Sequence, residues 1–118
     1  MCELCQGKSL AVSHLSVIDI LKGARDILSD PHRWHQGDTW RADRTGVCLR
    51  GACMLAAGLK HPLVVDTPET RTYYQALIEL RERAGTANVE EFNDADSTVH
   101  ADVLELVDKT LADLGGLA

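Results

Sequence analysis

The chain has 118 residues, of which 45% are hydrophobic and 25% are charged, as in an average globular domain. This length is enough for one domain whose core needs neither a disulfide nor a metal to fold. The formal charge of -6 opposes binding to a phosphate backbone, so we do not expect a nucleic-acid partner. No stretch approaches the roughly 18 apolar residues of a membrane span, and the N-terminus lacks the apolar run of a secretory signal. We therefore expect a cytoplasmic protein without a membrane partner.

The first predicted helix follows Ser16. Apolar residues recur there at the spacing of one helical face, at Val17, Ile20, Leu21, Ala24, Ile27 and Leu28. Ser16 and Asp19 have the spacing of a capping box at its start. Pro31 lacks the backbone N–H that a continuing helix needs, so the helix should end before it.

A short β-hairpin is predicted around residues 39–49. Residues 39–42 and 47–49 flank a turn that ends in Gly46, a residue suited to the left-handed position of a hairpin turn. An isolated ribbon is marginal in water, so we expect one aromatic side chain to anchor it on the helices, either Trp34 or Trp40.

Three further helices are predicted after the hairpin. Residues 50–58 are small and apolar all round, which indicates the most buried helix. Thr67 followed by Pro68 is typical of a helix start, and Gly85 of a helix end. Residues 88–96 have the composition of a polar link.

The last predicted helix begins after Ser97 or Thr98 and ends at the glycines that follow residue 114. Its capping box is predicted to be incomplete, because neither His100 nor Ala101 offers a carboxylate to the start of the helix.

Taken together, these elements predict a mainly α fold. We expect a compact bundle of about four helices with a short hairpin, built as a single helical domain over residues 1–118. Residues 1–12 form a loosely attached, cysteine-bearing segment in this prediction.

Cys2 and Cys5 form a C-x-x-C, which is half of a structural zinc site. Cys48 and Cys53 are five residues apart, which on a helix turns the side chains about 140° from each other at roughly 100° per residue. They complete a tetrahedral site only if they straddle the start of the helix. Zinc binding through Cys2 and Cys5 is therefore one hypothesis, and free thiols are the simpler interpretation.

Cys48 lies where the central helix is predicted to begin, and a helix N-terminus lowers the pKa of a thiol. A cysteine-dependent enzyme would need a histidine base and an orienting group, for which Asn93 or Asp94 is a candidate. The spacing selects none of the five histidines, which are His14, His32, His35, His61 and His100. The simpler interpretation is a buried cysteine that acts as a small hydrophobe.

Three motifs occur in order along the chain: Trp34-x-x-Gly37, Cys48-x-x-Gly51-Ala52 and Phe92-Asn93-Asp94. Their order resembles an uncharacterised family, a domain of unknown function of actinobacteria and their phages, in which Trp-x-x-Gly, Cys-x-x-Gly-Ala and Trp-Asn-Asp recur. The likeness spans residues 16–114, with Phe92 where the family usually has tryptophan. It implies a source but no activity.

We interpret the motif residues mainly as packing and turn positions, with an interaction surface as the alternative. They are Trp34, Gly37, Trp40, Cys48, Gly51, Phe92, Asn93 and Asp94. The function expected from the sequence is non-enzymatic protein–protein interaction, either with a second copy as a homodimer or, for a phage-borne gene, with a host protein. No cofactor is expected; the alternative is zinc.

Overall fold

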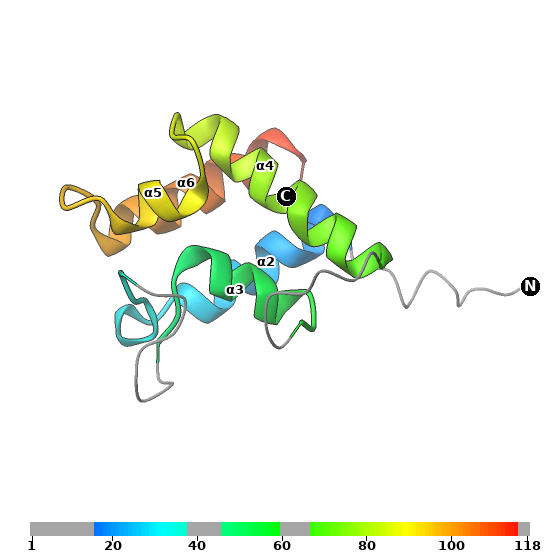
Figure 1. The fold of residues 1–118 in the computed structure, drawn as a ribbon, viewed down its shortest axis with the longest axis horizontal. Helices are drawn as coiled ribbons and strands as arrows, with labels where there is room; N and C mark the ends of the chain where they lie inside the picture. The colour runs from blue at the N-terminus through cyan, green and yellow to red at the C-terminus, as the bar shows by residue number, and fades with distance from the viewer. Residues whose placement is uncertain (1–15, 38–45, 60–66, 116–118) are drawn as a thin grey trace, which may run out of the picture.

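The computed structural model describes residues 16–37, 46–59 and 67–115 (Figure 1). These residues form five α-helices and one 3-10 turn. In chain order they are α2 (Val17–Leu28), η1 (Pro31–Arg33), α3 (Leu49–Ala56), α4 (Pro68–Ala84), α5 (Val89–Asp94) and α6 (His100–Asp113). The prediction of a mainly α fold is confirmed, with one short helix more than expected.

The start of α2 is fixed by the predicted capping box. Ser16 Oγ accepts a hydrogen bond from the Asp19 amide at 3.1 Å, and Asp19 Oδ2 accepts one from the Ser16 amide at 3.2 Å. The helix ends at Leu28, and Pro31 begins η1 with Asp30 as its cap. The capping box and Pro31 therefore predicted the two ends of this helix correctly.

Helix α4 also has the predicted ends. Thr67 Oγ1 accepts a hydrogen bond from the Thr70 amide at 3.1 Å, and Pro68 occupies the first helical position. At the other end Gly85 has a φ of 74°, a left-handed conformation that glycine adopts without strain.

Helix α2 packs against α3, α4 and α6. It lies beside α3 in Figure 1, and Gly23 of α2 packs directly against Ala56 of α3. A Cβ atom at Gly23 would lie 2.8 Å from the Ala56 Cβ, closer than two carbon atoms can pack. The two helices approach this closely because Gly23 has no side chain and Ala56 has a small one.

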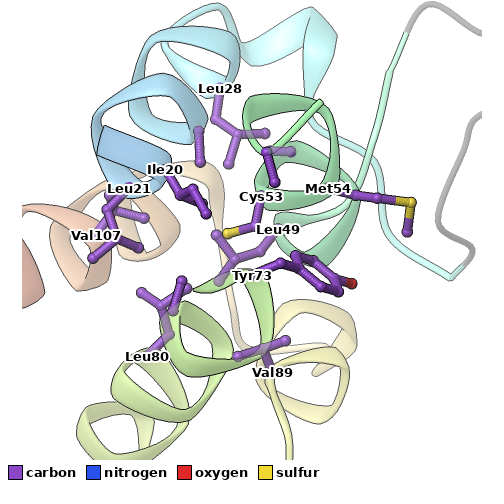
Figure 2. Close-up of a cluster of buried hydrophobic side chains, with 14 of the residues drawn as sticks. Ile20, Leu21, Leu28, Leu49, Cys53, Met54, Tyr73, Leu80, Val89 and Val107 are labelled. Carbon is purple, nitrogen blue, oxygen red and sulfur yellow. The ribbon is translucent and has the colours of Figure 1, made fainter. Parts of the chain in front are cut away.

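The hydrophobic core lies where α2, α3, α4 and α6 meet. Figure 2 shows Leu49 and Cys53 of α3 between Ile20 of α2 and Tyr73 of α4. Five of the eight residues of α3 are buried, namely Leu49, Gly51, Ala52, Cys53 and Met54, which confirms it as the most buried helix. None of the described helices combines the length and apolar character that a bilayer crossing requires.

The predicted hairpin is not supported. Residues 38–45, most of its span and including Trp40, lie outside the described residues. In the described part, the Val47 amide donates to the Arg33 carbonyl at 2.7 Å and the His35 amide donates to the Val47 carbonyl at 2.9 Å. Val47 thus forms an isolated parallel bridge with Trp34, and helix α3 begins at Leu49, where a strand was expected.

Residues 88–96, predicted as a polar link, contain helix α5. Asn88 Oδ1 accepts a hydrogen bond from the Glu91 amide at 2.8 Å and so caps this helix. Val89 and Asn93 are buried. The sequence did not predict this helix, because six residues are too few to show the periodic spacing of apolar residues that marks a helix.

Helix α6 begins one residue later than a cap at Thr98 predicts and two residues later than a cap at Ser97 predicts. Its N-cap is Val99, and Asp102 Oδ2 accepts a hydrogen bond from the Val99 amide at 3.0 Å. The prediction that no carboxylate serves this end was wrong, because a cap at Val99 places Asp102 at the third helical position. One half of the capping box is present, and valine has no atom that can provide the other half.

Replacing Val99 with serine should raise the free energy of unfolding by about 0.5–1 kcal/mol, because the new hydroxyl can accept from the Asp102 amide. Little burial is lost, since the Val99 residue is 55% exposed. Denaturant unfolding followed by circular dichroism measures the change. Val99→Ala is the matched control, and a Val99→Ser protein no more stable than Val99→Ala would refute the capping argument.

Candidate functional site

The side chain of Asn93 joins all three sequence motifs. It is fully buried, and its Oδ1 accepts hydrogen bonds from the Trp34 indole at 2.7 Å and from the Leu49 amide at 3.0 Å. Its Nδ2 donates to the His35 carbonyl at 3.0 Å and to Asp94 Oδ1 at 2.9 Å. Every hydrogen-bonding valence of the asparagine is therefore used within the protein. We call this set of contacts the Asn93 network.

Gln36 adds a second connection between the same two segments. Its Nε2 donates to the Asn93 carbonyl at 2.9 Å and also lies 3.2 Å from the Ala95 carbonyl and 3.3 Å from the Thr98 carbonyl. The two N–H groups of one amide are thus shared among three carbonyls between the end of α5 and the start of α6.

Gly37 completes the Trp34–Gly37 motif. Its amide donates to Asp94 Oδ1 at 2.9 Å, and its φ is 100°, a conformation that a residue with a Cβ rarely adopts. The glycine is therefore required by backbone geometry. The interpretation of Trp34, Gly37, Asn93 and Asp94 as packing and turn residues agrees with these contacts.

Cys48 is the N-cap of α3, and its Sγ accepts a hydrogen bond from the Gly51 amide at 3.3 Å. The residue is 4% exposed, and burial raises the pKa of its thiol even though the Gly51 and Arg50 amides act in the opposite direction. The hypothesis of a thiol activated by the helix N-terminus is not supported, because desolvation outweighs the effect of that terminus. The simpler interpretation of Cys48 as a buried cysteine agrees with its burial. Asn93, with no remaining valence, cannot orient a histidine toward it.

The remaining predicted site residues are not brought into one centre. Phe92 is half-buried and lines an open cleft of about 510 Å³ with Ala84 and Leu106. No three His, Cys, Asp or Glu side chains in the described ranges are grouped so that they could bind a metal ion. Cys2 and Cys5 lie outside the described residues, so zinc binding through them stays a prediction.

Arg50 connects α3 to α4 and α5. Its Nε donates to the Tyr73 hydroxyl at 2.8 Å, and its Nη1 pairs with Glu90 Oε2 at 3.0 Å. Burial raises the pKa of Tyr73 to about 12, so this hydroxyl is protonated at neutral pH. These contacts hold the start of α5 against α4.

A groove between α4 and α5, of about 170 Å³, is the feature that sequence reasoning missed. We call it the α4–α5 groove. It is mostly apolar, and its lining residues are Tyr74, Leu77, Ile78, Arg81, Ala87, Asn88, Val89 and Glu90. Tyr74 is 40% exposed and Ile78 is 36% exposed. These two residues and Arg81 lie at positions i, i+4 and i+7, beside the buried stripe of α4, and this second stripe is the signal that could have revealed the groove.

Asn93→Asp should lower the free energy of unfolding by about 3–5 kcal/mol, because it replaces two donors with an oxygen and places a charge in the interior. The new oxygen would face the His35 carbonyl and Asp94 Oδ1, which now accept from Nδ2. Guanidinium unfolding followed by circular dichroism measures the loss. Asn88→Asp is the control, since aspartate caps a helix as well as asparagine does. Equal costs at the two positions would contradict the importance of the network.

The buried thiols predict that stability falls at alkaline pH. Burial raises the pKa of Cys53 from its ordinary value of 9.0 to about 12, so above about pH 9 the unfolded chain releases a proton that the folded chain keeps. The slope from such a group is close to zero at neutral pH and approaches about 1.4 kcal/mol per pH unit once the pH is well above 9, with stability decreasing as pH rises.

Urea unfolding between pH 7 and 10, in the presence of a reductant, measures this slope. Cys53→Ala should be less stable at every pH but should show a shallower decrease. If the two proteins show the same slope, the thiol is not the cause.

Comparison with known protein families gives a match over most of the chain. A family model, described as a family of unknown function (DUF6197), matches residues 12–113. No curated protein and no solved structure matches the chain. The matched span contains the whole Asn93 network and the α4–α5 groove but excludes Cys2 and Cys5. Since it covers most of the sequence, the chain belongs to this family of unknown function, DUF6197.

Proposed function

We propose that this protein acts without catalysis, by binding another protein in the α4–α5 groove. The observation that carries the proposal is the exposed apolar stripe at the groove, where Tyr74 and Ile78 leave 40% and 36% of their surface to solvent. Large apolar side chains that line a concave surface are typical of sites that receive an apolar group from a partner.

The α5 side of the groove is held in place by core packing and by an ion pair, which favours binding. Val89, on its α5 side, is only 2% exposed and packs in the core. The neighbouring Glu90 is paired with Arg50, which also holds the Tyr73 hydroxyl. A site already formed before binding loses little conformational entropy when it is occupied.

Buried polar side chains form hydrogen bonds within the protein, which supports a role without catalysis. Asn93 is saturated by its network, and Thr110 Oγ1 donates to the Leu106 carbonyl at 2.8 Å. Thr70 Oγ1 lies 2.9 Å from Thr67 Oγ1 at the cap of α4. These groups serve the fold, so the chemistry available to a partner lies on the surface.

The resemblance of the three motifs to an actinobacterial and phage family suggests where the partner is found. If the gene is phage-borne, the partner in this proposal is a cytoplasmic protein of the host. The groove and its side chains are the same for either source, so the proposal rests on the groove.

The proposal is tested by selecting binders to the full chain from a displayed library of random 16-residue peptides. We expect selected peptides to shift the amide resonances of Ile78, Ala87 and Val89 in a labelled sample. Ala87→Leu adds three carbon atoms to an exposed residue of the groove wall, so it should weaken these peptides at least about tenfold, equivalent to 1.4 kcal/mol.

Ala101→Leu is the matched control, because Ala101 is exposed on α6 and does not line the groove. It should leave binding unchanged. The proposal fails if no selected peptide is weakened by Ala87→Leu, or if the shifted resonances belong to another face of the protein.

A further inference from the structure

The size of the α4–α5 groove limits what can occupy it. A cavity of about 150 Å³ in another protein holds one benzene ring. The groove, of about 170 Å³, therefore has room for one large apolar side chain between Leu77 and Ile78 of α4 and Val89 of α5. A partner would insert one anchor, such as leucine or phenylalanine.

The groove also carries an unbalanced positive charge. Its charged lining residues are Arg81 and Glu90, and Glu90 is paired with Arg50 at 3.0 Å. Arg81 forms no ion pair with any residue in the described ranges. On a protein whose formal charge is -6, Arg81 gives this end of the groove a local positive charge, which favours a carboxylate over an amine.

A second copy of this chain fits the groove poorly. Tyr74 and Ile78, at 40% and 36% exposure, together expose roughly 150 Å², whereas a stable interface buries about 800 Å² on each partner. Two copies also repel each other, since each has a formal charge of -6. The area and the charge both favour a short segment of a different protein.

The spacing along α4 sets the register of such a segment. Ile78 and Arg81 are three residues apart, which is about 4.5 Å along the helix axis. On a docked helix, side chains three or four residues apart are separated by a similar distance. An anchor beside Ile78 and a carboxylate beside Arg81 can therefore belong to successive turns of one helix.

We propose that the occupant of the groove is a helical segment of another protein with one large apolar anchor and a carboxylate one turn away, which pairs with Arg81. This inference rests on the proposed function, because it requires the α4–α5 groove to be the binding site. It specifies the chemistry of the partner, in the helix-in-groove mode of peptide recognition.

The groove-binding peptides from the library provide the test. We expect glutamate or aspartate to be enriched one turn from the anchor. From the tightest peptide, a Glu and a Lys version at that position are titrated into the wild-type protein by calorimetry, and the Glu version should bind about five-fold more tightly.

Arg81→Glu should reverse the preference, so that the Lys version binds more tightly. Lys22→Glu is the control, because it changes the net charge equally at an exposed position of α2 that does not line the groove. It should preserve the preference for the Glu version. Circular dichroism of each variant verifies that it is folded.

The outcomes separate the two proposals. Peptides that bind the groove without a preference for Glu, or whose preference survives Arg81→Glu, would overturn the partner chemistry and leave the proposed function standing. A selection that yields no groove-binding peptide would overturn both. A dimer seen by light scattering that dissociates on Ile78→Asp would assign the groove to a second copy and refute the inference.

Discussion

The structure depends on a buried asparagine whose four hydrogen bonds are all made inside the protein. Asn93 on α5 joins the Trp34 indole and the His35 carbonyl, which follow η1, to the backbone amide at the start of α3. Removing any one of these partners would leave a buried polar atom unsatisfied, which costs more than the bond itself contributes. The network therefore fixes how the chain enters α3 and how α5 sits beside it.

The parts of this fold that follow from the sequence are those determined by neighbouring residues. Ser16 with Asp19, Thr67 with Pro68, and Gly85 each act within one helical turn, so α2 and α4 were predicted with correct ends. The small side chains of α3 predicted its burial for the same reason. Each of these residues favours one local backbone conformation over the others, so its effect can be predicted without knowledge of the tertiary structure.

The parts that could not be predicted depend on contacts between distant residues. Trp34 and Asn93 are 59 residues apart, and nothing near either one shows that they share a hydrogen bond. Val47 had the composition of a hairpin strand, but its backbone groups form hydrogen bonds with Arg33 and His35, and the next residue, Cys48, caps helix α3. The groove was missed because exposed residues on α4 form a surface only once α5 lies against them.

Helix α5 belongs to both the groove and the Asn93 network. Val89 and Glu90 border the groove at its start, while Asn93 and Asp94 hold the network at its end. A helix of six residues has little stability of its own and persists only through its tertiary contacts. Under the proposed function, a partner bound at the start of α5 would lower the population of the locally opened state, so occupancy of the groove and amide protection at Leu49 would be thermodynamically linked.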